Sequence, residues 1–216
     1  MVAFTTRRGG VSEGVYESLN LSIGTGDDRT RVAENRRIAC ESLGLDAHRL
    51  SFNRQVHSPT VHRAGGRGVA GDGLWSDEPG QPMAAFSADC LPIAIARTDG
   101  VRALAVLHAG WRGLSEGIVA AGVAAIGTGE TAAVIGPAIG PCCYEVGPEV
   151  SQRFDADLTV VRKLDLWAAA ERALRRAGVA RVDRVDMCTR CNPGDFFSHR
   201  RSGRARGVQG LIGAVA

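Results

Sequence analysis

Three short segments of the chain each place a metal ligand or a nucleophile at the edge of an apolar run. They carry His57, Cys90 and His108. Zn²⁺ accepts cysteine sulfur and histidine nitrogen, and catalytic zinc sites usually have three protein ligands and one open position. Two histidines and one cysteine therefore match the ligand set of a catalytic zinc site.

The positions of these residues leave two other interpretations open. Separations of 33 residues between His57 and Cys90, and of 18 between Cys90 and His108, are not those of a zinc finger. Cys90 and His108 could instead form a nucleophilic pair without a metal. All three could also be satisfied core side chains. Spacing alone does not decide between these interpretations.

Residues beside these three indicate how such a site would be completed. Asp89 directly precedes Cys90, and a carboxylate near a ligating histidine often fixes the orientation of the ring. We therefore expect Asp89 to orient His108 or to carry a proton. Arg112 suits a phosphate because its guanidinium binds such anions bidentately, although a surface ion pair is an alternative. Trp111, between two glycines, either stacks on a planar base or fills the core.

The segment around His199 is the most basic in the chain. His199 is a candidate for contact with a substrate, and four arginines lie within residues 200–206. The whole chain has 26 basic and 23 acidic residues, a net charge of +3, which is too small to indicate a nucleic-acid partner. We interpret residues 200–206 as a solvated surface that tolerates phosphate.

Two further pairs of cysteines receive no role from the sequence. Cys142 and Cys143 follow Gly-Pro and are expected to pack at a turn. Cys188 and Cys191 form a C-x-x-C motif without a second pair at zinc-finger spacing. Residues 193–194, Pro-Gly, argue against the helix that thioredoxin-like chemistry requires. We therefore predict neither a four-ligand zinc site nor a redox pair here.

The apolar pattern predicts the elements that position these residues. Buried strands are expected at residues 83–86, 91–96, 102–107 and 132–135. Helices are expected after the N-cap Asp28, from Ser115 to about Ile126, from Pro148, and from 166 to 177. Residues 64–73 are rich in glycine and are predicted to be a loop. Strands and helices mix without strict alternation, which predicts a mixed α/β fold.

Length and composition fit one domain with a proper core, since 44% of the 216 residues are hydrophobic. No apolar run approaches the roughly 20 residues of a membrane helix, and the first eight residues lack the apolar region of a signal peptide. We expect a cytoplasmic protein without a membrane partner. Its cysteines are then expected to be thiols or ligands instead of disulfides.

Longer motifs indicate a family. They run almost from end to end and include FTTRRGGVS at 4–12, QVH at 55–57, ADCLP at 88–92, HAGWRG at 108–113, YEV at 144–146 and FSHR at 197–200. The chain closely resembles the bacterial YfiH-like family. These laccase-domain or polyphenol oxidase-like proteins are understood as purine nucleoside phosphorylases. Cys191 lies outside the pattern of the family.

The resemblance implies a fold and a metal. The fold is a four-layer α/β/β/α sandwich with mixed sheets, in which residues 1–216 form a single YfiH-like catalytic domain. The implied cofactor is Zn²⁺ held by His57, Cys90 and His108. The implied assembly is a monomer or a homodimer.

The resemblance also implies an activity. The partners are a purine nucleoside and phosphate, and the reactions are phosphorolysis of adenosine, inosine or methylthioadenosine and deamination of adenosine. The catalytic residues would be Cys90, Asp89 and His108. From charge and motif position, the residues expected to bind substrate or phosphate are Arg7, Arg112, Trp111 and His199.

Three alternatives to this activity remain open on the sequence. Older labels of the family propose copper-dependent oxidation of phenols, and two histidines with one cysteine do occur in blue-copper centres. A multicopper oxidase needs a further cluster with many more histidines, however, and the chain has only five. The others are a metal-free hydrolase that uses Cys90 and His108, and a binding protein with a structural zinc ion.

Overall fold

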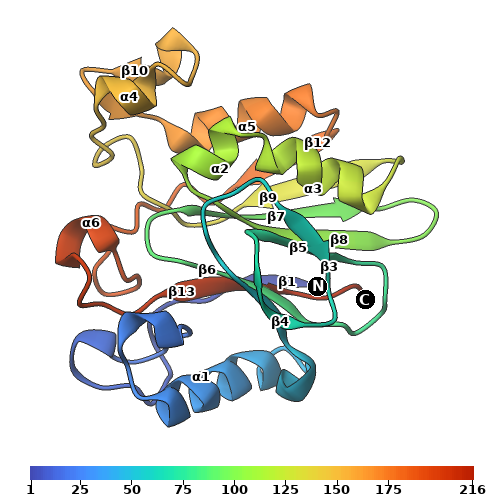
Figure 1. Ribbon diagram of the computed structural model, residues 1–216, viewed down its shortest axis with the longest axis vertical. Helices are drawn as coiled ribbons and strands as arrows, with labels where there is room; N and C mark the ends of the chain where they lie inside the picture. The colour runs from blue at the N-terminus through green and yellow to red at the C-terminus, as the bar shows by residue number, and fades with distance from the viewer.

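The computed structural model describes residues 1–216 and contains two large mixed β-sheets packed face to face (Figure 1). The strand order of the five-stranded sheet is β1 (Val2–Phe4), β13 (Gln209–Gly213), β6 (Met83–Ser87), β2 (Ser51–Arg54) and β4 (Arg67–Ala70). The order of the six-stranded sheet is β12 (Arg181–Arg184), β9 (Thr131–Ile135), β7 (Leu91–Arg97), β8 (Ala103–Ala109), β5 (Gly73–Ser76) and β3 (Val61–Arg63).

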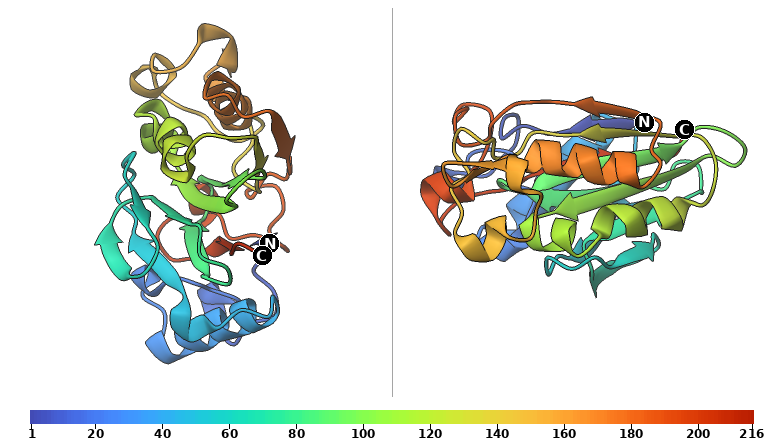
Figure 2. Two further views of the ribbon diagram at one scale, coloured as in Figure 1. Left: turned by 90° about the vertical axis from the view of Figure 1, so that its right-hand side faces the viewer. Right: turned by 90° about the horizontal axis from the view of Figure 1, so that it is seen from above.

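Helices cover both outer faces of this pair of sheets, as Figures 1 and 2 show. The five-stranded sheet is covered by α1 (Arg29–Glu41). The six-stranded sheet is covered by α2 (Trp111–Ser115), α3 (Ile118–Ile126) and α5 (Leu166–Arg176). The four-layer α/β/β/α sandwich is therefore confirmed.

Shorter elements complete the chain. They are the helices α4 (Pro148–Ser151) and α6 (His199–Ser202), the strands β10 (Thr159–Val160) and β11 (Lys163–Leu164), and 3₁₀ turns at Gly14–Tyr16, Ile23–Thr25, Ala47–Arg49 and Ala156–Leu158. None of the helices has the length and apolar character needed to cross a membrane.

Strand β8 shows how an uninterrupted apolar run serves two cores. Leu104 and Val106 pack into the core between the sheets, whereas Ala105 and Leu107 pack into the core beneath the helices. Successive side chains of a strand point to opposite faces. His108 lies two residues after Val106, so its side chain points to the same face of β8, toward the five-stranded sheet. The strand thereby carries a histidine to the seam between the sheets.

Most of the predicted elements are confirmed, and two predictions are wrong. The helix expected from Ser115 begins only at Ile118, because Gly117 has a φ of 96° and separates α3 from α2, which ends at Ser115. The loop predicted over residues 64–73 contains β4, an exposed edge strand that pairs with β2. Because β4 is exposed along its whole length, its residues lack the apolar alternation that marks a strand.

Candidate functional site

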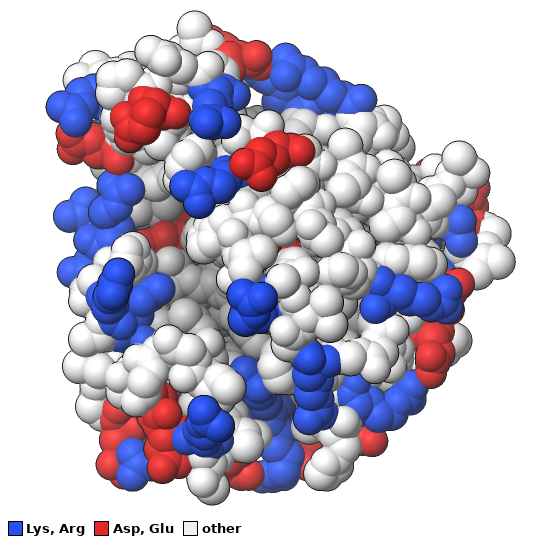
Figure 3. Space-filling view, in the orientation of Figure 1, with Lys and Arg blue, Asp and Glu red and all other residues white.

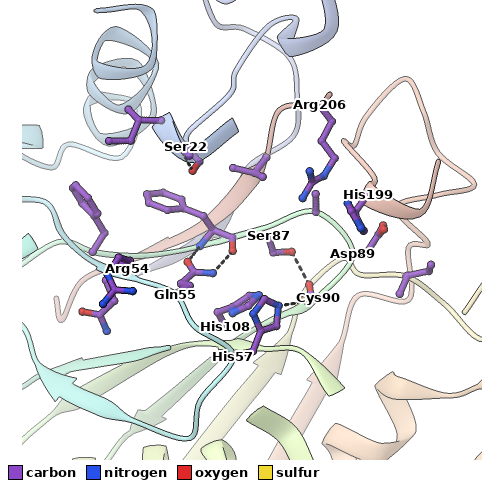
Figure 4. A pocket seen from close by; sticks show the side chains of 18 of the residues that line it. Ser22, Arg54, Gln55, His57, Ser87, Asp89, Cys90, His108, His199 and Arg206 are labelled. Carbon is purple, nitrogen blue, oxygen red and sulfur yellow. Dashed lines mark hydrogen bonds between the residues drawn. The ribbon is translucent and has the colours of Figure 1, made fainter. Parts of the chain in front are cut away.

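The structure brings His57, Cys90 and His108 together (Figure 4). Their ligand atoms all lie within 4.8 Å of one another. Cys90 Sγ is 3.8 Å from His57 Nε2, and the two imidazole rings meet edge to face with centroids 4.9 Å apart. Three residues distant in the sequence thus form one cluster of donors.

Each of the three residues comes from a different part of the chain. His57 lies in the loop that follows β2, and Cys90 lies in the turn between β6 of one sheet and β7 of the other. His108 lies near the end of β8, opposite Pro92 in β7. Since β7 and β8 are antiparallel, the start of one and the end of the other meet at the same edge of the sheet.

The side chain that organises this cluster is the fully buried carboxylate of Asp72. Its Oδ1 accepts hydrogen bonds from His108 Nδ1 at 2.8 Å and from the backbone N–H of His57 at 3.0 Å. Its Oδ2 accepts from the backbone N–H groups of Val56 and Ser58 and from the Ser58 hydroxyl. His57 has a φ of 62°, which is uncommon for a residue with a side chain. Asp72 therefore fixes both the strained loop of His57 and the ring of His108.

The expectation that Asp89 orients His108 is wrong, because Asp72 occupies that position. The Asp89 carboxylate instead accepts the Thr189 hydroxyl and the Arg200 backbone N–H, each at 2.6 Å. These bonds hold Asp89 at a φ of 98° beside Cys90. Its role in proton transfer stays a prediction.

Charges at the cluster stabilise one another against the cost of burial. Burial opposes ionisation of Asp72, but the hydrogen bonds from His108 and from Ser58 outweigh it and hold the pKa of this carboxyl well below its usual range. Burial also opposes the charge on His108, but Cys90 and Asp72 outweigh it and raise the pKa of His108 to about 9. His108 and His57 likewise outweigh burial and lower the pKa of Cys90 to about 6. Cys90 is therefore a thiolate at neutral pH.

The cluster fits a metal ion with two nitrogen ligands and one sulfur ligand. A carboxylate can only accept, so His108 Nδ1 keeps its proton, and a metal ion would displace the proton on Nε2 to bind there. Gly110 keeps this space open, because a Cβ at that position would lie 2.8 Å from His57 Cδ2 and 3.1 Å from Cys90 Sγ. Three protein ligands of this kind match a catalytic zinc site.

A cavity of about 890 Å³ opens beside the cluster. Figure 3 shows the hollow and the basic side chains around it. The aromatic side chains in its wall are Phe52, Phe86, Trp111 and Tyr144, and the arginines are Arg36, Arg54, Arg200 and Arg206. The only acidic residue that lines it is Asp89. The cavity therefore combines apolar faces with a surplus of positive charge, which suits a planar ligand that carries an anion.

Two of the four residues predicted to bind substrate line this cavity, namely Trp111 and His199. Arg7 does not line it, because its guanidinium donates to the carbonyl oxygens of Glu17 and Pro193. Arg112 does not line it either. It is exposed and stacks over the ring of Trp111.

Arg206 is a cavity residue that the sequence did not single out. In Figure 4 its side chain points into the cavity from the side opposite His57 and His108. Its Nε is buried without a hydrogen-bond partner, and burial lowers the pKa of the guanidinium. The interpretation of residues 200–206 as a solvated surface is therefore wrong for Arg206, whereas Arg200 lines the cavity and remains exposed. Only the position of Arg206 in the fold reveals a guanidinium with an unpartnered donor at the cavity.

Comparison with known proteins identifies the family. A family model described as multi-copper polyphenol oxidoreductase laccase matches residues 1–214. The chain belongs to this family. It is 37% identical to a Pseudomonas aeruginosa protein named purine nucleoside phosphorylase, over 96% of this chain and 90% of that protein. It is 34% identical to Escherichia coli YfiH, which has the same name, over 91% of this chain and 86% of YfiH.

Solved structures agree with this assignment. The crystal structure of YlmD from Geobacillus stearothermophilus superposes with a TM-score of 0.90 at 32% identity, over 100% of this chain and 92% of that chain. The Neisseria meningitidis protein NMB0706 superposes with a TM-score of 0.90 at 34% identity, over 100% of this chain and 94% of that chain. The resemblance to the YfiH-like family is thus confirmed in sequence and in fold.

The electrostatics of the cluster predict unusual reactivity of Cys90 in the metal-free protein. Its alkylation rate by iodoacetamide, followed by peptide mass spectrometry, should reach half of its maximum near pH 6, against about 8.5 for an ordinary cysteine. The reason is that protonated His108 stabilises the thiolate. In a His108→Gln variant the midpoint should move up toward the ordinary value. A wild-type midpoint near that of an ordinary cysteine would contradict the ion pair.

Proposed function

We propose that this protein is a zinc-dependent purine nucleoside phosphorylase that acts on adenosine, inosine and methylthioadenosine and also deaminates adenosine. The observation that carries the proposal is one cavity that joins the His57–Cys90–His108 cluster to the unpartnered Nε of Arg206. The names of the relatives support the purine nucleoside phosphorylase part of this proposal. The cavity volume of about 890 Å³ is ample for a nucleoside and a phosphate together.

Zinc held by His57, Cys90 and His108 would supply a Lewis acid at the wall of the cavity. Copper-dependent oxidation of phenols is disfavoured by the donors of this chain. Only two of its five histidines belong to the cluster. His62 contacts the Ala70 carbonyl oxygen and His199 contacts that of Gly203. No second group of histidines is present to bind further copper ions.

The aromatic side chains provide a binding surface for the purine base. Tyr144 and Trp111 line the cavity, and Arg200 lies over the Tyr144 ring with 5.1 Å between its guanidinium carbon and the ring centroid. Planar bases stack favourably on such rings. Gln55 is not available to the base. Its Nε2 donates to the Phe86 carbonyl oxygen, and its Oε1 accepts from the Phe86 backbone N–H.

Phosphorolysis requires a phosphate oxygen to form a bond to C1′ while the bond from C1′ to the base nitrogen breaks. The electron pair of that bond goes to the base, which takes up a proton as it leaves. Arg206 and Arg200 would hold the phosphate, because guanidinium groups bind such anions and fix their orientation. Asp89 and His199 line the same cavity, and we assign proton transfer at the leaving base to them.

Deamination of adenosine would use the same cavity with water in place of phosphate. Water adds to C6 of the adenine, the bond from C6 to the amino nitrogen breaks, and ammonia leaves. Asp89 is adjacent to Cys90 at the cluster, so we assign it the transfer of the proton that ammonia takes up.

One geometric observation favours a second candidate, a hydrolase without metal. His108 lies between Cys90 and Asp72, since its Nδ1 donates to Asp72 and a ring nitrogen lies within 4.8 Å of Cys90 Sγ, and this order of cysteine, histidine and carboxylate is that of a nucleophilic triad. Such an enzyme would be inactivated by thiol alkylation but not by a chelator. The phosphorylase would lose activity under both treatments.

Product analysis tests the proposal directly. Zinc-loaded wild type incubated with adenosine and phosphate should form adenine with ribose 1-phosphate, and also inosine, as detected by mass spectrometry. Cys90→Ala should form none of them because it lacks a ligand of the cluster. Cys40→Ala, which changes a buried cysteine of α1 that does not line the cavity, is the matched control and should remain active. Absence of these products from wild type, or equal amounts from Cys90→Ala, would refute the proposal.

The assignment of the phosphate site to Arg206 predicts a selective change in kinetics. Arg206→Gln should raise the KM for phosphate by roughly 10- to 100-fold, since a hydrogen bond to a charged group contributes about 1.5–3 kcal/mol. The KM for inosine should change far less. Arg204→Gln, at an exposed position two residues away, should leave both constants unchanged. An equal rise in both constants for Arg206→Gln would contradict a phosphate-specific role.

A further inference from the structure

Four cysteines outside the catalytic cluster come together in the structure. They are Cys142, Cys143, Cys188 and Cys191, and their sulfur atoms all lie within 4.8 Å of one another. The sequence predicts no role for either pair, because the C-x-x-C motif has no second pair at zinc-finger spacing. A parallel bridge between Ala138 and Cys188 brings the two segments side by side, and Cys142 and Cys143 supply the second pair that the C-x-x-C motif lacks in the sequence.

The distances between these sulfur atoms suit a single metal ion. Cys191 Sγ lies 3.4 Å from Cys143 Sγ and 3.7 Å from Cys142 Sγ. Four sulfurs bound tetrahedrally to zinc at about 2.3 Å would be roughly 3.8 Å apart. Disulfide sulfurs would be about 2.05 Å apart, and all six cysteines of the chain are free. The cluster thus has the spacing of a tetrathiolate site and not that of two disulfides.

Two polar contacts support the segments that carry the four thiols. The backbone N–H of Gly140 donates to Cys188 Sγ at 3.3 Å, as outer hydrogen bonds commonly do at metal ligands. Lys163 Nζ donates to the carbonyl oxygen of Cys142 at 2.9 Å, which brings a positive charge to the cluster. Gly140 itself must be a glycine, because a Cβ there would lie 2.5 Å from the Trp167 ring. This close approach holds the turn that presents Cys142 and Cys143.

We propose that Cys142, Cys143, Cys188 and Cys191 bind a structural zinc ion at a second metal site, separate from the catalytic cluster. Tetrahedral sites with four sulfur ligands select zinc or iron, and a zinc site with four protein ligands leaves no open position for catalysis. This inference goes beyond the proposed function and does not depend on it.

The position of the cluster gives the ion a role in the architecture of the cavity. One of the two joined segments carries Tyr144 into the cavity wall. The other carries Thr189, whose hydroxyl donates to Asp89. Neither segment belongs to a long helix or strand. A zinc ion between them would fix their relative position, and with it the wall that faces Cys90.

Metal analysis of variants tests the proposal without any reading of activity. Elemental analysis by inductively coupled plasma mass spectrometry should find two zinc ions per chain in wild type. It should find one in Cys90→Ala and one in a Cys188→Ala/Cys191→Ala double variant. A variant that combines all three changes should contain none. Cys40→Ala is the matched control and should retain both. The double variant should also unfold at a lower temperature, since a structural zinc site contributes directly to folding.

X-ray absorption at the zinc edge provides a second test that leaves the four cysteines intact. In a His57→Ala/Cys90→Ala variant, the remaining zinc should show sulfur ligands only, at about 2.3 Å. The proposal is overturned if this variant contains no zinc, if its zinc has nitrogen or oxygen ligands, or if iron takes its place. Disulfides among the four cysteines in the freshly purified protein would overturn it as well. None of these outcomes bears on whether the other cluster performs phosphorolysis.

Discussion

The candidate site depends on the buried carboxylate of Asp72. A carboxylate removed from water is stable only when hydrogen bonds replace its hydration, and Asp72 accepts them from three successive backbone N–H groups, a hydroxyl and an imidazole. Two of these donors belong to His57 and His108, which lie on different elements. One charge therefore sets both the backbone of the first histidine and the ring of the second. Because a buried polar group left without a hydrogen-bond partner is costly, the two histidines are held together.

The sandwich architecture determines where this carboxylate can act. The chain crosses from the five-stranded to the six-stranded sheet between β6 and β7, and Cys90 lies in that crossing. His108 reaches the same seam through the alternation of β8, and Asp72 precedes β5, which pairs with β8. The cavity lies at this seam, so both sheets contribute to its wall. The core between the sheets thereby supports the geometry of the cluster.

Local signals in the sequence predicted much of this arrangement. Asp28 and Asp165 cap α1 and α5 through hydrogen bonds to N–H groups a few residues away, so the sequence alone carries the information. The buried strands are likewise visible in the sequence, because they are short apolar runs. The three cluster residues stand out because histidine and cysteine are rare at the edges of such runs, and the family resemblance identified them as a set.

What the sequence did not reveal depends on contacts between distant segments. Asp72 and His108 are 36 residues apart, and Cys142 and Cys191 are 49 apart. Nothing local marks such pairs before the strand order is known. Arg206 resembles an ordinary surface arginine in a basic segment, and only burial of its Nε distinguishes it from Arg204. Asp89 was assigned to His108 from adjacency to Cys90, whereas the pairing of β5 with β8 places Asp72 there.

The zinc dependence of inosine phosphorolysis in an Asp72→Asn variant tests this account most directly. An amide cannot accept at both of its terminal atoms, so the loop of His57 and the ring of His108 lose their common support. Loss of such an outer partner typically weakens metal binding by about 10- to 100-fold, and half-maximal activity should require correspondingly more zinc than in wild type. An Asp77→Asn control, which alters an ion pair with Arg63 outside the cavity, should match wild type. Equal zinc requirements in Asp72→Asn and wild type would contradict the role of Asp72.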